Sequence, residues 1–251
     1  FVGDYEGFNR AAHLRYVRMP GGEKAIDEPW RMAEAYLADA GLPSLDDSHK
    51  VASARRTAIR QLVQRGVNSP WTSSAGRLFD AVAALIGLRQ SVAFEGQAAM
   101  ELEWLATDAD NDSSYPFDLE GSEFGLERPI IIDTRPLIVA MVKELRRGTP
   151  TAVIARRFHN TLVEIISQVC HRIRTVTLIE SLVTSGGVFQ NILLAEGVRA
   201  RLAEQGFRVY MHQQVPANDG GLSLGQIAIA AATMRQDSAV PASVPSSCGA
   251  Y

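Results

Sequence analysis

The last third of the chain alternates between strand-like and helix-like segments, and this order constrains the fold more than any other feature. The apolar segment SLVTSGG, residues 181–187, is expected to be a buried strand that meets two glycines. Residues 192–206 indicate a helix, residues 208–215 a second strand, and a further helix starts near residue 219. This order predicts a βαβ unit with parallel strands, whose ligands bind beyond the carboxyl ends of the strands.

The residues before this unit carry mostly helical signals. Pro29 suits the first turn of a helix, and a hydroxyl at Ser73 or Ser74 can cap another. Gly66 and Gly87 stand just past two of the predicted helix ends. The predicted helices span 29–40, 48–66, 72–87, 96–106 and 150–174. The other predicted elements are short strands near 14–17 and 115–119, and a strand that becomes a helix at Pro136.

Composition limits the classes of function. The 251 residues suffice for one large domain or two small lobes that share a core. The net charge of -3 gives no field that attracts nucleic acid, and no segment is apolar for long enough to cross a bilayer. We therefore expect neither a nucleic-acid nor a membrane partner. Cys170 and Cys248 show no disulfide or zinc spacing, which is typical of a cytoplasmic protein without zinc.

The two ends of the chain differ from its body. Residues 1–235 are expected to form the folded region, and the Ser-, Ala- and Pro-rich residues 236–251 a mobile or surface-draped tail. The first residue is not Met, which suggests a piece of a longer protein or a processed product.

The first candidate site is the turn TSGGVFQN, residues 184–191. Glycine at 186 and 187 lets a phosphate approach the backbone closely, because no Cβ intrudes. Free N–H groups at the start of the next helix can bind the anion, and Asn191 can hydrogen-bond a ribose, a base or the backbone. A tight strand-to-helix turn explains Gly186 and Gly187 as well, since the motif is neither a P-loop nor GxGxxG.

The second candidate is NDGGLSLGQ, residues 218–226. Asp219 is well placed to cap a helix, and taken alone that is its expected role. Gly220 and its neighbour, however, cost helix propensity, about 1 kcal/mol each, which a cap does not need. A carboxylate beside two glycines suggests a magnesium or iron ion, or a polyphosphate. Gly225 and the small residues after it indicate tight helix packing.

Two further stretches carry weaker signals. Gly76 and Asp80 lie four residues apart on one helix face, where Gly76 can admit a nucleotide sugar and Asp80 can bond its hydroxyls. A small packing residue and an ordinary surface carboxylate explain this pair equally well. Glu95 lies in a turn before Gly96 and is a candidate, whereas Glu101 and Glu103 are expected to be solvated.

The histidines and Cys170 suggest no further chemistry. The five histidines form neither HxxxH nor HExxH, so they predict no zinc site, and no GxSxG indicates a serine hydrolase. His159 lies within the longest predicted helix and is expected to be a packed histidine. Cys170 lies on an apolar helix and is expected to be structural.

Five stretches occur here in the order found in a known family: SSAGRLFDAVAAL, FEGQAAMELEWLA, ARRFHNTLVEII, SGGVFQNILL and VPANDGGLSLGQ. Together with the segment from Gly3 to Leu37, they resemble the HypF family, the carbamoyltransferases that mature [NiFe]-hydrogenases. The resemblance covers nearly the whole chain except the tail. It implies a Kae1-like α/β fold on the actin/Hsp70/sugar-kinase (ASKHA) plan, in which two lobes surround a nucleotide cleft. The chain is then expected to be a C-terminal portion with the second lobe and part of the first.

The resemblance also implies a reaction. Carbamate made from carbamoyl phosphate reacts with ATP to give carbamoyl adenylate. The carbamoyl group then passes to the C-terminal cysteine of the partner HypE, where it becomes the cyanide ligand of the hydrogenase. By position, Asp219 matches the aspartate that holds a divalent metal near the phosphates. The positions that match the family's nucleotide pocket are Gly76, Asp80, Gly186, Gly187, Asn191 and Gly220.

One departure from the family leaves alternatives open. The family's metal-binding histidine cluster lies upstream of Phe1, so an incomplete metal site is expected here. An antibiotic-tailoring O-carbamoyltransferase shares the fold and would use a sugar hydroxyl as acceptor. The isolated chain is alternatively a non-catalytic module that docks a partner or forms a homodimer. An unrelated α/β protein is the remaining alternative.

Overall fold

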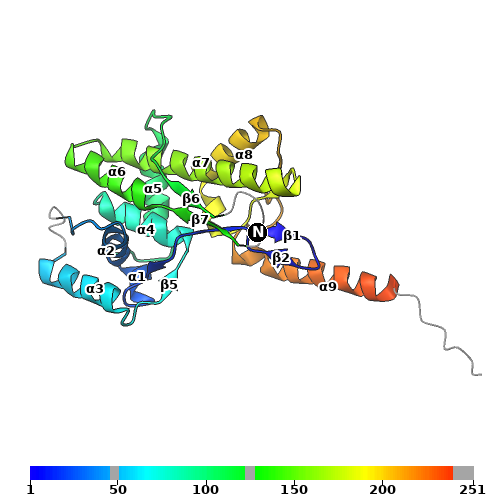
Figure 1. Ribbon diagram of the computed structural model, residues 1–251, viewed down its shortest axis with the longest axis horizontal. Coiled ribbons are helices and arrows are strands. Elements are labelled where there is room, and N and C mark those ends of the chain that lie inside the picture. The colour runs from blue at the N-terminus through cyan, green and yellow to red at the C-terminus, as the bar shows by residue number, and fades with distance from the viewer. Residues whose placement is uncertain (46–50, 122–127, 240–251) are drawn as a thin grey trace, which may run out of the picture.

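The structure is a computed structural model that describes residues 1–45, 51–121 and 128–239. A block of packed helices forms most of the molecule (Figure 1). A small βαβ unit lies beside this block, and the last helix, α9, extends away from it (Figure 1). Helices and strands both contribute, as the α/β expectation requires.

The helical block is a series of helices packed one against the next. Helix α2 contacts α4, α4 contacts α5, α5 contacts α7, and α7 contacts α8. Apolar side chains such as Met32, Leu78, Leu102 and Phe158 are fully buried between them, and this burial supplies the main stabilisation. The bounds are α1 (Lys24–Asp27), α2 (Trp30–Asp39), α3 (Ser53–Arg65), α4 (Ala75–Leu85), α5 (Gln97–Thr107), α6 (Arg135–Arg146) and α7 (Thr151–Thr177).

Local signals explain where these helices begin and end. The Ser74 hydroxyl accepts a hydrogen bond from the Arg77 N–H and so caps α4, as predicted. Gly66 ends α3 with φ of 66°, a left-handed conformation that favours glycine. The five predicted helices are therefore confirmed within the described residues, with ends that differ by a few residues, while residues 48–50, where one of these predictions begins, lie outside the described part of the chain.

Short strands lie at the edge of the helical block. Strand β7 (Ile130–Asp133) pairs in parallel with β3 (Ala12–Leu14) and antiparallel with β6 (Asp118–Glu120), in the order β3-β7-β6. The single strand predicted near 14–17 is wrong, because β3 ends at Leu14 and β4 (Val17–Arg18) pairs with β5 (Trp71–Thr72) in another sheet. The remaining pair is β1 (Val2–Gly3) with β2 (Phe8–Asn9).

The predicted βαβ unit is present. Strands β8 (Ser181–Val183) and β9 (Arg208–Tyr210) pair in parallel, and α8 (Ile192–Glu204) connects them. The prediction that β8 is buried is wrong, because only Leu182 turns toward the core while Val183 is 70% exposed. Helix α8 packs against β9, and the outward side chains Val183 and Tyr210 are exposed.

Helix α9 (Leu222–Ala239) is the least buried helix in the described part of the chain. Its apolar residues Leu224 and Ile227 are exposed, and a Cβ placed on Gly225 would meet nothing within 4 Å. The tight packing predicted around Gly225 is therefore wrong. The helix includes residues 236–239, so the prediction that the tail begins at residue 236 is wrong, while residues 240–251 with Cys248 lie outside the described residues. No described helix is both long and apolar enough to cross a membrane.

Candidate functional site

Two loops meet beyond the carboxyl ends of β8 and β9. The Gly186 N–H donates a 2.7 Å hydrogen bond to the Ala217 carbonyl, which ties the glycine turn to the loop that carries Asp219. A Cβ on Gly187 would lie 3.9 Å from the Asn218 Cβ, so the contact continues along the turn. Each loop ends in a short 3₁₀ turn, Gly187–Gln190 in one and Asp219–Gly221 in the other. The structure thus brings together the two strongest sequence candidates.

The glycines of these loops are needed by the fold itself. Gly186 has φ of 99°, which a side chain would strain. A Cβ on Gly220 would lie 2.8 Å from the Pro216 Cγ, and one on Gly221 would lie 3.0 Å from the Pro216 carbonyl oxygen. Close approach of the chain to itself therefore explains Gly220 and Gly221, and their number alone does not indicate a ligand.

Asp219 is available to a ligand. The cap of its turn is Asn218, whose Oδ1 accepts a 3.0 Å hydrogen bond from the Gly220 N–H, so the expected cap role of Asp219 is wrong. Asp219 is exposed, and no hydrogen bond or ion pair of its carboxylate occurs within the described residues. These residues contain no group of three His, Cys, Asp or Glu side chains that could hold a metal. Asp219 therefore fits a cation that takes most of its ligands from phosphates and water, as magnesium does.

Two polar side chains that the sequence did not single out lie at the same strand ends. His212 follows β9 and Ser185 follows β8, and the His212 Nε2 lies 3.0 Å from the Ser185 Oγ. Both residues are exposed beside the glycine turn. Their position just past two parallel strands was the signal that could have identified them.

The start of α8 does not offer the free N–H groups that the sequence suggested. A Glu103 Oε1 on α5 accepts hydrogen bonds from the backbone N–H groups of Ile192, at 2.6 Å, and Leu193, at 3.4 Å. The Asn191 Oδ1 accepts a third, from Leu194 at 2.9 Å. An anion site at this helix start is therefore wrong, because a protein carboxylate already occupies it. The expectation that Glu103 is solvated is wrong for the same reason.

Beneath the glycine turn lies a buried histidine. The Asn191 Nδ2 lies 3.0 Å from the His159 Nε2, and the His159 Nδ1 lies 2.8 Å from the Ala155 carbonyl oxygen. Burial lowers the pKa of His159 to about 4; the bond to Ala155 opposes this shift and the charge of Arg156 adds to it. The prediction that His159 is packed is confirmed, since it is 2% exposed. Cys170 is buried as well, and burial raises its pKa to about 11.

Helix α4 approaches the same region through Phe79, whose ring centre lies 5.5 Å from that of His159. Gly76 lies one turn earlier on this helix, and a Cβ there would come no closer than 3.6 Å to the Ser74 Oγ. Packing therefore does not require glycine at position 76, and space remains beside it.

Asp80 is buried, so the alternative of an ordinary surface carboxylate is wrong. Its Oδ2 lies 2.8 Å from the Arg77 Nη1, yet the angles leave both buried atoms without a hydrogen bond. Burial raises the pKa of Asp80 to about 6, Arg77 opposes the rise and Glu95 adds to it. The Glu95 carboxylate is exposed and acts on Asp80 through space.

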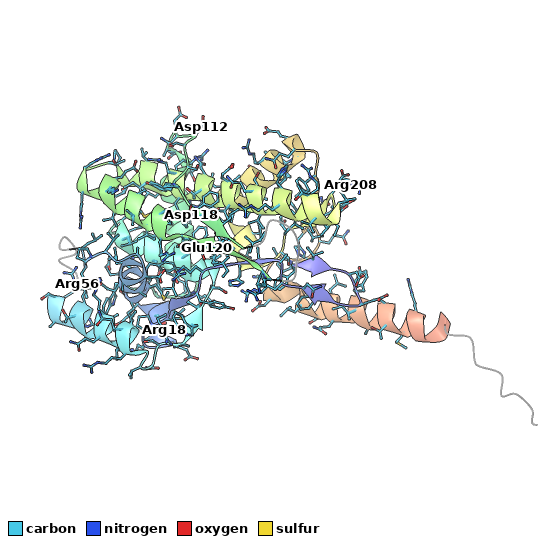
Figure 2. All side chains as sticks on the ribbon, in the orientation of Figure 1. Arg18, Arg56, Asp112, Asp118, Glu120 and Arg208 are labelled. Atoms are coloured by element: carbon cyan, nitrogen blue, oxygen red, sulfur yellow. The ribbon has the colours of Figure 1, made fainter. Side chains whose placement is uncertain are left out.

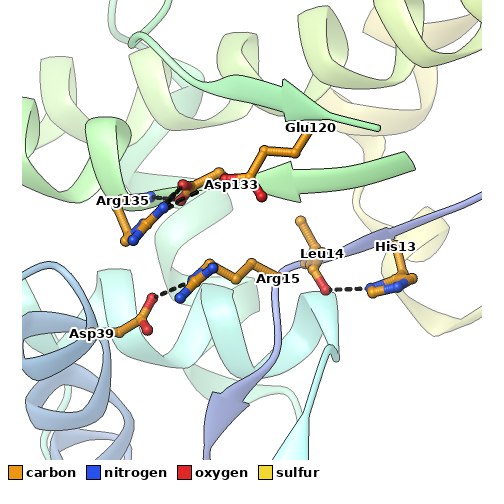
Figure 3. Close-up of polar contacts among 7 residues, drawn as sticks. All are labelled: His13, Leu14, Arg15, Asp39, Glu120, Asp133 and Arg135. Carbon is orange, nitrogen blue, oxygen red and sulfur yellow. Dashed lines mark hydrogen bonds and ion pairs between the residues drawn. The ribbon is translucent and has the colours of Figure 1, made fainter. Parts of the chain in front are cut away.

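A second polar cluster lies where β3 and β7 end (Figure 3). The Arg135 Nε lies 2.9 and 2.8 Å from the two carboxylate oxygens of the buried Asp133, and its Nη2 also pairs with Asp133 and Glu120. Arg15 pairs with Asp39 at 3.3 Å. Burial alone would raise the pKa of Asp133, but the guanidinium and N–H of Arg135 hold it below its usual value. Each carboxylate of this cluster has an arginine partner within the protein.

Of two cavities in the described chain, one lies away from the glycine turn, and the other is lined by His159 beneath that turn and by Leu193 at the start of α8. One of about 480 Å³ lies between α2 and α4, and one of about 430 Å³ lies between α7 and α8. The second cavity is lined by several charged side chains, namely Asp112, Arg156, Glu164, Glu196 and Arg201, of which Asp112 is labelled in Figure 2. Neither cavity is lined by Gly186 or Asp219. The candidate site is therefore an open surface between two loops.

Comparisons with known proteins agree with this geometry. Residues 1–226 match the sequence model of a family described as carbamoyltransferase, Kae1-like domain, second subdomain. The carbamoyltransferase HypF of Rhodobacter capsulatus is 40% identical over 94% of the chain. A crystal structure of full-length HypF in the phosphate- and nucleotide-bound form superposes with a TM-score of 0.83 at 37% identity, covering 92% of the chain and 30% of that protein.

The comparisons also show how much of each relative the chain covers. HypF of T. kodakarensis has the same fold, with a TM-score of 0.74 at 23% identity over 91% of the chain and 30% of its own. The chain spans 30% of the length of the relative from Rhodobacter capsulatus. The expected Kae1-like fold is confirmed, and the match is to one region of a longer protein.

Proposed function

Since the chain belongs to the family of carbamoyltransferases with a Kae1-like domain, and matches its second subdomain, we propose that it binds ATP as part of a HypF-type carbamoyltransferase. The observation that carries this proposal is the contact between the two loops beyond β8 and β9. The Gly186 N–H donates a hydrogen bond to the Ala217 carbonyl, and the unpaired carboxylate of Asp219 lies two residues after Ala217. An exposed backbone turn beside a free carboxylate suits a phosphate chain with a bound cation.

Each candidate residue has a part in this site. Gly186 and Gly187 in one turn and Gly220 in the other would line the phosphates, and Asp219 would supply one oxygen ligand to the cation, magnesium or iron. A bound cation neutralises phosphate charge and orients the α-phosphorus for attack. The chain's own contribution is to hold the phosphates against the turn.

Helix α4 forms the other side of the proposed site. The space beside Gly76 admits the sugar of the nucleotide. Asp80 lies one turn later on the same helix and is assigned to the ribose hydroxyls; its Oδ2 is buried and pairs with Arg77, so the sugar has to displace that contact. Phe79, between these two positions, contacts His159 and so links α4 to Asn191.

The reaction has two steps. A carbamate oxygen attacks the α-phosphorus of ATP, which gives carbamoyl adenylate and releases pyrophosphate. The thiolate of the C-terminal cysteine of HypE then attacks the carbamoyl carbon, forms a thiocarbamate and releases AMP. Loss of water from this thiocarbamate gives a thiocyanate on the same cysteine, which is the precursor of the cyanide ligand of [NiFe]-hydrogenase. We place this chemistry in the cytoplasm.

Calorimetric titration with ATP and magnesium tests the nucleotide site. Asp219→Ala should weaken binding by about tenfold or more, since it removes the only proposed protein ligand to the cation. Glu204→Ala, which removes an exposed carboxylate from the end of α8, should leave affinity unchanged. Equal affinity of the wild type and Asp219→Ala would contradict the site. If nucleotide binds but no thiocarbamate forms on the terminal cysteine of HypE, the proposal that HypE is the acceptor is contradicted and the nucleotide site is not.

A further inference from the structure

A chain of hydrogen bonds runs from the first turns of α7 to the start of α8, which follows the glycine turn. It starts at the Ala155 carbonyl, passes through the imidazole of His159 and the carboxamide of Asn191, and ends at the Leu194 N–H. His159 is 2% exposed and Asn191 is 8% exposed, so water does not replace these contacts. Asn191 is the last residue before α8 and directly follows the turn Gly187–Gln190.

Only one arrangement of protons satisfies this chain. The Ala155 oxygen can only accept, so the His159 Nδ1 carries the proton and its Nε2 is a lone pair. The Leu194 N–H can only donate, so the atom of Asn191 facing it is Oδ1. The Asn191 Nδ2 therefore donates to the His159 Nε2, and every donor meets an acceptor.

We propose that His159 is a positioning residue of the nucleotide site, which fixes the orientation of the Asn191 carboxamide and thereby the hydrogen-bonding character that Asn191 presents to a ligand. This inference rests on the proposed function, since it assigns a ligand contact to Asn191. One Nδ2 hydrogen is used by His159 and the second is free. Asn191 therefore meets the nucleotide with a donor, and the facing group is an acceptor, such as a ring nitrogen or a ribose oxygen.

A second contact holds the same segment. The Glu103 carboxylate on α5 accepts hydrogen bonds from the backbone N–H groups of Ile192 and Leu193, which directly follow Asn191. The segment is therefore fixed by α5 and α7 together. The Asn191 carboxamide cannot rotate by 180° without breaking its hydrogen bond to His159. Neutral His159 keeps the acceptor in place, whereas a second donor at Nε2 would force the carboxamide to reverse.

Three variants of the full chain test the proposal. His159→Phe keeps a ring of similar size and removes the acceptor, so Mg–ATP affinity should fall by about tenfold. His159→Gln can offer its amide oxygen to Asn191, so affinity should return to within about threefold of the wild type. Ile165→Ala is the matched control: it removes a buried side chain from the same helix and offers Asn191 no polar change. Its affinity should be that of the wild type.

Two measurements without nucleotide keep the proposal separate from the proposed function. Nitrogen NMR of the imidazole should show the proton of His159 on Nδ1. Hydrogen exchange at the Leu194 N–H and the Asn191 carboxamide should speed up in His159→Phe, but not in His159→Gln. Failure of the wild type to bind Mg–ATP would overturn the proposed function and the ligand contact of Asn191. A proton on Nε2, or equal exchange and affinity in His159→Phe and the wild type, would overturn the positioning role itself.

Discussion

The two places where parallel strands end use their polar groups differently. At the ends of β3 and β7, Asp133 pairs with Arg135, and Arg15 pairs with Asp39 (Figure 3). At the ends of β8 and β9, Asp219 has no ion-pair partner among the described residues. Both regions lie beyond the carboxyl ends of parallel strands, the position where ligands bind in many α/β sheets, but among the described residues the carboxylates of the first region are paired and Asp219 is not.

The difference shows what a strand end needs in order to bind a ligand. Charges that pair within the protein stabilise the fold but have little left to offer a ligand. A loop that leaves its carboxylate exposed needs support of another kind. Beneath the glycine turn this support comes from neutral groups, His159 and Asn191, together with Glu103 at the helix start.

Lowering the pH from about 6.5 to about 4 should distinguish the two regions most strongly. The pKa of His159 lies near 4 in the fold and near 6.5 in the unfolded chain, so the unfolded chain takes up the proton first. The stability supplied by neutral His159 is full above about pH 6.5 and is lost as the pH falls toward 4, by about 3 kcal/mol. Asp133, whose folded pKa is lowered, loses its contribution only at lower pH.

Urea unfolding of the wild type and His159→Gln across this pH range measures the effect. Asp80 changes the free energy of unfolding in the opposite direction. Its pKa is raised in the fold, so the folded chain takes up this proton first and becomes more stable as the pH falls through about 6. Its contribution is present in both proteins, so the difference between the two curves isolates His159. Parallel curves would show that His159 does not titrate as its burial requires.

Asp133→Asn should destabilise the protein by about 2 kcal/mol, because a buried carboxylate loses its charge-assisted bonds to Arg135. This loss of stability is smaller than for a fully buried ion pair, since the Arg135 side chain is 40% exposed and water can solvate its guanidinium. Glu120→Gln, which alters an exposed partner of the same arginine, should cost less than about 0.5 kcal/mol. Urea unfolding tests both, and a loss of Mg–ATP affinity in folded Asp133→Asn would show that this cluster also serves the ligand.

Gly76→Ala should raise stability by about 0.5–1 kcal/mol, because alanine favours the helix and its Cβ meets no close neighbour. The same methyl group should lower Mg–ATP affinity by about fivefold, since it fills space assigned to the nucleotide. Gly225→Ala on α9 is the matched control, with open space around its Cβ. It should gain similar stability without losing affinity, and equal affinity of the two variants would remove Gly76 from the site.

The sequence by itself determined the main helices and the order of the βαβ unit. Caps at Ser74 and Gly66 and the apolar periods predicted the helices, and the alternation after residue 180 predicted the parallel βαβ unit. These features depend on residues within a few positions of one another, which is why a pattern along the chain reveals them. Family resemblance, carried by five ordered motifs, added the Kae1-like fold.

Only the tertiary structure decided which polar groups are used and which are free. The bonds from Glu103 to Ile192 and from His159 to Asn191 join residues far apart in the sequence, so no local pattern predicts them. The same holds for the burial of Asp80 and the exposure of β8, because both depend on which helices cover them. A charge is free for a ligand only when the folded chain brings it no partner, and partners in space are set by packing.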